Sequence, residues 1–215
     1  SEELQVQGKS FDQTLNWIAG LFYSDSEQPD FDNYVNLILG ARRAFLSESP
    51  SDSVALYAQG TYDLSSVLDG LKFTAGFRYT WDERSTNTSS VQASAVQSQQ
   101  ISASFHAPTW TVGLDYHLAP TTMVYVNSSR GFRDGGFNTG TLSFPASFDV
   151  FGPEYVTDVE AGIKSDWSIW GMKARTNVAA YYEWYDSIQI TQNLPYVVNG
   201  STLIASIIQN AGSAE

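Results

Sequence analysis

The polar clusters of this 215-residue chain are the places where chemistry could occur, and the first is rich in carboxylates. Four acidic residues fall within eight positions, at Asp25, Glu27, Asp30 and Asp32. Carboxylate oxygens bind hard cations, so a calcium or ferric site is one interpretation. The spacing matches no EF-hand loop, however. We therefore interpret the run as a solvated, acidic outer loop and expect no metal site.

The chain has two histidines, His106 and His117, which raise the question of hydrolytic catalysis. His117 shares its expected strand face with Asp115, an arrangement that could orient a general base. A nucleophilic site also needs a hydroxyl within hydrogen-bond reach of that base. Nothing marks one of the many serines for this role. We expect polar filling of an interior here, with no catalytic residue and no cofactor; an outer-membrane hydrolase is the weaker alternative.

A third cluster combines two basic residues, Arg130 and Arg133, with Asp134, three glycines and Asn138. Glycine permits positive φ and close approach of the backbone to another group. The functional interpretation is that these four polar residues bind a ligand, with the arginines attracting an anionic chelate or contacting a further domain. The simpler interpretation is an interior ion pair that holds a loop.

The elements that would position these clusters are strands. From Leu71 to Asp82, apolar and aromatic residues alternate strictly with Lys72, Thr74, Gly76, Arg78 and Thr80. A period of two over about twelve residues predicts a two-faced strand. Strands of soluble proteins usually run about 5–6 residues, whereas a tilted strand that crosses a bilayer needs about 9–11. The length favours a membrane strand.

Similar segments bring the expected number of strands to roughly nine. They lie at residues 3–7, 17–23, 54–62, 71–82, 110–118, 123–130, 159–167, 172–190 and 202–209. Short connections alternate with long ones, chiefly Asp25–Asp52, Arg84–Ala107 and Phe132–Pro153. Compact soluble domains rarely contain such loops, but outer-membrane barrels do. We predict an all-β fold, an antiparallel up-and-down transmembrane β-barrel segment, with Ser85–Ser104 as a mobile loop or a strand extension.

The energetics of burial determine which face meets lipid. A basic residue near the bilayer midplane on the lipid side costs about 2–4 kcal/mol. We therefore expect Phe73, Phe77 and Trp81 to meet lipid, and the polar face to meet a wet lumen. The residues expected to face this lumen are Lys72, Arg78, Asp115, His117 and Lys164.

Aromatic residues gather near the expected strand ends, where interfacial belts occur. Tyr181, Tyr182, Trp184 and Tyr185 could instead stack on sugar or chelate rings, although neighbouring residues of a strand point to opposite faces. In four strands a glycine lies on the polar face between apolar residues, as in Ala19-Gly20-Leu21 and Ala161-Gly162-Ile163. Such glycines suggest curvature or the close approach of another group.

Composition excludes several classes of function. With 23 acidic and 11 basic residues, the net charge of −12 argues against nucleic-acid binding. The chain has no cysteine, which excludes disulfides, thiolate metal sites and cysteine nucleophiles. No run of about 18 apolar residues predicts a transmembrane helix.

Several segments resemble the barrel of TonB-dependent outer-membrane receptors. Ser129–Asn138 reads Ser-Arg-Gly-Phe-Arg-Asp-Gly-Gly-Phe-Asn and is similar to the family's Ser-Arg-Gly-Phe-Lys-Ser-Gly-Gly-Phe-Asn stretch. Further matches, in family order, are Asn16–Tyr23, Ala55–Leu64, Thr74–Thr80, Pro153–Glu154 with Glu160–Ser165, and Asn210–Gly212. The resemblance implies a barrel of about 22 strands with a plug domain and a TonB box. This chain carries neither, so residues 1–215 are expected to form one partial barrel domain.

The resemblance implies a receptor and transporter for scarce ligands, chiefly ferric siderophores, rather than an enzyme. It further implies that the protein lies in the bacterial outer membrane, contacts the lipid there, and binds a ferric chelate or another small ligand. Transport would be energised by the TonB complex through the plug. No nucleic-acid partner is expected. The alternative function is a small stand-alone β-barrel or β-sandwich that binds glycans through surface tyrosines.

Overall fold

The computed structural model describes residues 1–27, 29–36, 41–92, 95–138, 150–198 and 201–214, and it is built of β-strands. The strands are β1 (Glu2–Ser10), β2 (Leu15–Ser26), β3 (Pro29–Asn36), β4 (Ala41–Glu48), β5 (Ser51–Asp63), β6 (Leu71–Gln92), β7 (Ala95–Ala119), β8 (Thr122–Arg133), β9 (Gly136–Phe137), β10 (Val150–Phe151), β11 (Glu154–Ile169), β12 (Met172–Asp186), β13 (Gln189–Val198), β14 (Ser201–Asn210) and β15 (Ser213–Ala214). Within these ranges, no helix is long and apolar enough to cross a membrane.

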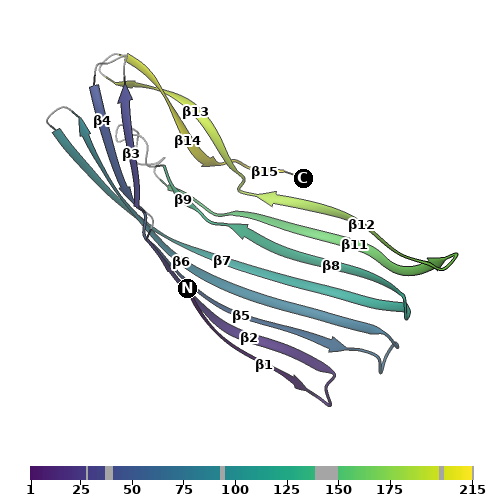
Figure 1. Cartoon of the computed structure of the whole chain (residues 1–215). Coiled ribbons are helices and arrows are strands. Elements are labelled where there is room, and N and C mark those ends of the chain that lie inside the picture. Colours follow the sequence, from purple (N-terminus) through teal and green to yellow (C-terminus); the bar gives the residue numbers. More distant parts are fainter. Residues whose placement is uncertain (28, 37–40, 93–94, 139–149, 199–200, 215) are drawn as a thin grey trace.

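Most of the strands form one antiparallel sheet. In the described part of the chain its path runs β1-β2-β5-β6-β7-β8-β11-β12-β15, and Figure 1 shows these strands side by side as a curved wall. The β3–β4 hairpin pairs with the far half of β6, and β13–β14 form a separate hairpin that projects from the same end. The prediction of an all-β, antiparallel up-and-down sheet is confirmed.

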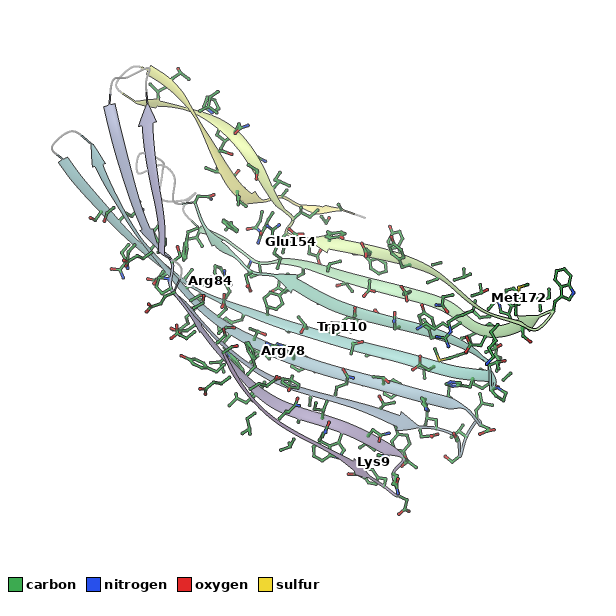
Figure 2. The ribbon with its side chains drawn as sticks, viewed as in Figure 1. Lys9, Arg78, Arg84, Trp110, Glu154 and Met172 are labelled. Carbon is green, nitrogen blue, oxygen red and sulfur yellow. The ribbon has the colours of Figure 1, made fainter. Side chains whose placement is uncertain are left out.

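The pairing register sorts the side chains onto two faces. Phe77 lies opposite Ala58 and Trp110, and the next residue, Arg78, lies opposite Tyr57 and Thr109. We call the face of Phe77 the outer face and the face of Arg78 the inner face. Figure 2 shows Arg78 in the middle of the sheet, Arg84 nearer the projecting hairpins, and Met172 at the opposite end.

The outer face is apolar and is not packed into a protein core. Phe73, Phe77 and Trp81 are 37%, 52% and 38% exposed. Leucine, valine and isoleucine side chains of the neighbouring strands share this face and are exposed to a similar degree. An apolar face of this extent is the surface that lipid covers in a membrane barrel.

The most buried residues of the sheet lie on the inner face, near the end of the long connections. Each of them is at most 8% exposed: Ala55, Thr80, Asp82, Thr86, Phe105 and Ala107. They are neighbours on β5, β6 and β7, because Thr80 pairs with Ala55 and Ala107. The segment after β8 covers them, and its Gly135 lies directly against the ring of Phe105.

Short turns join the strands at the other end. The β11–β12 connection is a two-residue turn in which Trp170 and Gly171 have φ of 51° and 80°. Positive φ at both central residues is the geometry that matches the twist of a hairpin. Trp170 is 91% exposed at this tip.

The strand assignments differ from the sequence-based expectation in four places. The expected connection Asp25–Asp52 contains the β3–β4 hairpin. The expected strand 202–209 is part of β14, which belongs to the separate hairpin and not to the main sheet. The expected strand 172–190 ends at Asp186. The connection 84–107 is mostly regular strand, since β6 and β7 stay paired from Arg84 to Gln92, so Ser85–Ser104 is a strand extension. Residues 37–40 and 139–149, inside the other two expected loops, lie outside the described residues.

Candidate ligand-facing wall and rim

The five residues predicted to face a lumen come from three strands, β6, β7 and β11, and share the inner face. Lys72 lies opposite Asp115 on the neighbouring strand. His117 lies opposite Met123, which in turn lies opposite Lys164 on the next strand. Arg78 lies on the same side of β6 as Lys72 because six residues separate them. The register thus gathers these charges on one wall, opposite the apolar outer face.

Arg78 lies in a hollow of this wall. The hollow has a volume of about 430 Å³, and its lining residues on the inner face are Glu3, Tyr57, Gln59, Gly76, Arg78, Thr109 and Thr111. Ala58, Phe77, Trp110 and Arg130 also border it, although the register places their side chains on the outer face. The guanidinium carbon of Arg78 lies 5.0 Å from the ring centroid of Phe22 and 6.0 Å from that of Tyr57. Its Nε donates to the hydroxyl of Thr80 at 3.3 Å. Aromatic faces stabilise a cation in this way, so a positive charge stays positioned over the hollow.

Two tyrosines lie across glycines of the neighbouring strand. The ring of Tyr57 covers Gly20, and its hydroxyl donates to Glu3 at 2.6 Å. The ring of Tyr125 covers Gly162 in the same manner, and its hydroxyl donates to Glu160 at 2.6 Å. A Cβ at Gly162 would lie 2.6 Å from the Tyr125 hydroxyl oxygen. At Gly20 and Gly162 the missing side chain therefore gives room to a cross-strand aromatic ring, which explains the glycine at two of the four recurrent positions.

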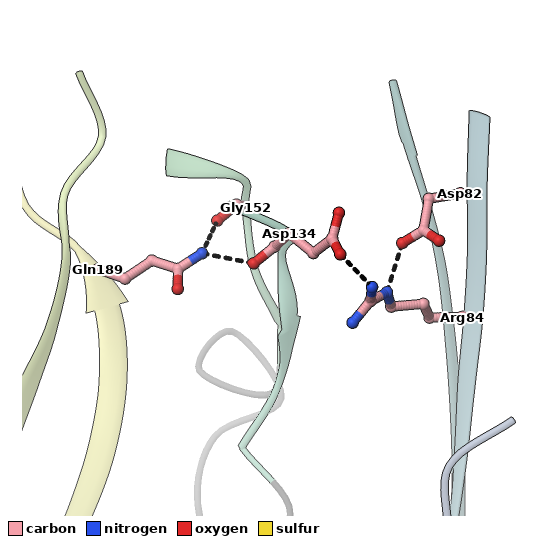
Figure 3. A network of polar contacts seen from close by, with 5 residues as sticks. All are labelled: Asp82, Arg84, Asp134, Gly152 and Gln189. Carbon is pink, nitrogen blue, oxygen red and sulfur yellow. Dashed lines mark hydrogen bonds and ion pairs between the residues drawn. The ribbon is translucent and has the colours of Figure 1, made fainter. Parts of the chain in front are cut away.

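An ionic network joins the wall to the segment that follows β8. Arg84 on β6 contacts the carboxylate of Asp82 on the same strand, and its Nη2 lies 2.5 Å from Oδ2 of Asp134 (Figure 3). Asp82 is 4% exposed as a residue. A buried carboxylate needs such a partner. Arg84 therefore pairs with two carboxylates and holds Asp134 over the inner face.

The network continues to the β13–β14 hairpin through Gln189. Its side-chain amide donates to the backbone carbonyl oxygens of Asp134 at 2.7 Å and Gly152 at 3.1 Å (Figure 3). Its backbone N–H donates to a carboxylate oxygen of Glu154 at 2.7 Å. One glutamine thus links the start of the hairpin to both ends of the connection between β8 and β11.

Asparagine side chains attach the rest of the hairpin. The amide of Asn138 donates to the carbonyl of Ile208 at 2.8 Å and accepts from the N–H of Ile208 at 2.7 Å. Asn210 accepts from the N–H of Gly152 at 2.6 Å and donates to the carbonyls of Gly152 and Ser187. These amides satisfy backbone groups as a paired strand would. Asn138 is therefore engaged within the protein.

The surroundings of Asp134 change its acidity. Burial raises the pKa of the Asp134 carboxyl above its ordinary value, the charge of Arg84 acts in the opposite direction, and Asp82 adds to the rise. The protonated form is favoured relative to a solvated aspartate. We call the end of the sheet that carries the long connections, together with the segment after β8 that covers it, the rim. The link between Arg84 and Asp134 is thus a pH-sensitive contact of the rim.

The two arginines of the predicted cluster lie on opposite faces. Arg133 pairs with Glu154 on the inner side, whereas Arg130 pairs with Trp110 and Thr157 on the outer side. The guanidinium carbon of Arg130 lies 4.4 Å from the ring centroid of Tyr155. Arg133, Asp134 and Asn138 are neighbours at the rim, and Arg130 is separated from them by the sheet. Their role in binding a ligand stays a prediction.

The remaining candidate residues are dispersed. His106 pairs with Trp81 on the outer face and His117 lies on the inner face, so the sheet separates the two histidines. Tyr182 and Trp184 share the outer face with ring centroids 4.8 Å apart, whereas Tyr181 and Tyr185 face the other way. Part of the acidic run Asp25–Asp32 lies outside the described residues. Among the residues that are described, no three metal-binding side chains cluster.

Sequence reasoning missed Arg84, Gln189 and Asn210, the residues that connect the rim. Asn210 lay within a segment of family resemblance, so that resemblance could have indicated a structural role. Arg84 and Gln189 carried no signal because their partners are 50 and 55 positions away. Such contacts depend on how the connections fold back over the wall.

Comparison with known proteins identifies this arrangement. Residues 2–215 match the sequence model of the family described as TonB dependent receptor-like, beta-barrel. The chain belongs to this family. Members of the TonB-dependent receptor family are outer-membrane β-barrel proteins of Gram-negative bacteria. No curated protein sequence matches the chain significantly.

Solved TonB-dependent receptors share the fold at low sequence identity. The ferric yersiniabactin uptake receptor FyuA from Yersinia pestis superposes with a TM-score of 0.76 and 16% identity, over 98% of this chain. The ferric-catecholate import receptor Fiu from K12 E. coli gives a TM-score of 0.61 and 14% identity over 96% of this chain. The chain spans 30% and 32% of those two receptors. It therefore corresponds to a part of a TonB-dependent receptor barrel.

Proposed function

We propose that this chain forms part of the wall and outer rim of a receptor that takes up scarce ligands through the bacterial outer membrane, with ferric siderophores as the ligand class. The observation that carries the proposal is the division of one sheet into an apolar outer face and an inner face that gathers the charges. Hydrocarbon tolerates the first face and excludes the second. The inner face is then the border of a wet path.

The rim is the proposed ligand side of this path. Asp134 and Asn138 hold the segment after β8 over the inner face, and Arg133 adds a positive charge beside them. Further along the wall, Arg78, Lys72 and Lys164 are proposed to face the lumen together with Asp115 and His117. Arg130 points to the other face, so this proposal assigns it no contact with the ligand.

The proposed activity is transport and not catalysis. Energy would come from the TonB complex through a plug domain, as the family implies, and the bound ligand would be a ferric chelate. No cofactor is part of the proposal. The outer face is proposed to contact outer-membrane lipid. Nucleic acid is not among the proposed partners.

The test is uptake of radioactive iron by cells that depend on the full-length protein, supplied with catecholate, hydroxamate or mixed-ligand ferric chelates. We expect uptake of at least one class. Arg84→Met should weaken binding of that chelate about tenfold, because it releases Asp134 from the wall and leaves Asp82 unpaired. Arg175→Met is the matched control, since Arg175 pairs with Asp166 at the other end of the sheet. A protein that takes up none of these chelates would contradict the proposal.

A further inference from the structure

Arg130 is a basic residue on the apolar outer face, and its charge has no protein partner there. Its guanidinium makes no hydrogen bond or ion pair with the residues that the structure describes, and its Nε is buried without an acceptor. A buried N–H donor without an acceptor is costly in an apolar setting. Such a group requires a ligand that the protein itself does not supply.

The register fixes the position of Arg130 on the outer face. Arg130 lies opposite Thr157 on β11 and opposite Trp110 on β7. The same row of paired residues continues across the sheet to Phe77 and Ala58. None of these neighbours carries a charge, so no carboxylate of the row can neutralise the guanidinium. The row is continuous with the face that lipid covers.

The height of Arg130 along β8 places it near the upper boundary of that face. It lies eight residues beyond Thr122, where β8 leaves the short turn. A tilted strand crosses the hydrocarbon in about 9–11 residues. The cost of a basic residue on the lipid side falls from about 2–4 kcal/mol at the midplane to about 0–1 kcal/mol near the interface. Arg130 is therefore close to the upper boundary of the hydrocarbon, on the side of the long connections, where a long basic side chain can extend to the lipid headgroups.

Aromatic side chains surround this level, as they do at membrane interfaces. Arg130 stacks over the ring of Tyr155, whose hydroxyl donates to the backbone carbonyl of His106 at 2.9 Å. Tyr79 and Trp81 lie two and four residues beyond Phe77 on β6, with their ring centroids 4.5 Å apart. The Tyr155 ring holds the planar guanidinium in one orientation. A fixed guanidinium presents its terminal nitrogens as a fork, which is the geometry that binds phosphate.

We propose that Arg130, held over Tyr155, binds a phosphate group of a membrane lipid headgroup on the outer face of the barrel. Attraction of opposite charges and continuity with the lipid-covered face both favour a lipid over a soluble anion. The phosphate supplies the acceptors that the protein lacks at this position. The site lies on the opposite face of the sheet from the proposed ligand path, so it is independent of the ligand that the receptor takes up.

The test uses the full-length protein in nanodiscs of the phosphate-free lipid digalactosyldiacylglycerol, with either bisphosphorylated lipid A or lipid A from which a phosphatase has removed both phosphates. We expect a higher thermal midpoint with the phosphorylated lipid, and tighter binding of that lipid in native mass spectrometry. Arg130→Gln should weaken this binding about tenfold, as the loss of a charge-assisted hydrogen bond predicts. Arg130→Lys should keep most of it, because the charge remains.

The controls separate a lipid site from a structural role. Arg175→Gln removes one positive charge from the inner face and should leave the difference between the two lipids unchanged. If Arg130 only stabilised the fold, Arg130→Gln would lower the midpoint equally in both lipids, and that result would overturn the proposal. Equal stabilisation of the native protein by inorganic phosphate in nanodiscs without lipid A would overturn the lipid assignment as well.

Discussion

At the scale of single residues, the rim depends on close contacts that leave no space for additional atoms. Gly135 is the clearest example, since its backbone lies between the ring of Phe105 and the carbonyl of Phe151. Arg84 and Asp134 provide the charged counterpart of this packing. Substitutions at these positions test whether the rim is as tightly built as the distances indicate.

Gly135→Ala should destabilise the rim by about 1–3 kcal/mol, the usual cost of overpacking. The added Cβ would lie 2.6 Å from both Cε1 of Phe105 and the carbonyl oxygen of Phe151. The backbone carbonyl cannot move away without shifting β10. Gly212→Ala is the control, because an added Cβ there meets nothing within 4 Å. Equal thermal midpoints for the two variants would show that the contact at Gly135 is loose.

The raised pKa of Asp134 predicts the direction in which the stability of the protein changes with pH. Burial raises the pKa of Asp134 in the folded protein above its value in the unfolded chain. Its contribution to stability is therefore fully present below the ordinary aspartate pKa and is lost as the pH rises through the raised pKa. The wild-type protein should thus lose stability relative to Asp134→Asn as the pH rises across this window. Denaturant unfolding of both proteins over a pH series measures the difference; a gain instead of a loss would mean that attraction to Arg84 outweighs burial.

At the scale of elements, the β13–β14 hairpin is held to the wall by side-chain amides rather than by sheet pairing. Removing them should loosen the hairpin without affecting the main sheet. Asn138→Ala leaves the N–H and the carbonyl of Ile208 without partners, at a cost of about 1–3 kcal/mol. Amide hydrogen exchange over residues 201–210 should accelerate, while exchange in β2 and β5 should not change.

The control for this experiment is Asn193→Ala. Asn193 is exposed on β13 and makes no side-chain hydrogen bond with the described part of the chain. Its replacement should leave exchange in the hairpin unchanged. Unchanged exchange after Asn138→Ala as well would show that the hairpin is held by contacts other than this amide.

The elements that the sequence predicted well are those that lie at the level of the membrane. Seven expected strands, from 3–7 to 159–167, fall inside β1, β2, β5, β6, β7, β8 and β11. Their alternation exists because one face meets hydrocarbon and the other does not. The expected glycine contacts were also found, with a tyrosine ring as the approaching group in two strands.

The elements that the sequence did not predict lie beyond that level. The extension of β6 and β7 is rich in serine and glutamine on both faces, so it carries no period of two. The β3–β4 hairpin and most of β13 were expected as connections for the same reason, whereas β14 was expected as a strand. Where water meets both faces of a strand, the physical cause of alternation is missing. The rim contacts of Arg84 and Gln189 add a second difficulty, since they depend on tertiary folding.

At the scale of the whole molecule, the account depends on the assignment of the two faces of the sheet. The family match and the fold of solved receptors establish a TonB-dependent receptor barrel. The register then assigns Phe77 and Arg78, adjacent in sequence, to opposite environments. The proposed lumen, the ligand-side rim and the lipid phosphate site all follow from that separation.

The most direct test measures these environments along β6. The chain has no cysteine, so single cysteines can be placed at positions 71–82 of the membrane-embedded full-length protein and spin-labelled. The collision rate of the spin label with oxygen, which dissolves in lipid, should be highest at positions 73, 77 and 81. Its collision rate with a water-soluble nickel chelate should be highest at positions 72, 76 and 78. The opposite phase, or no alternation, would contradict the assignment of lipid to the aromatic face and of water to the face of Arg78.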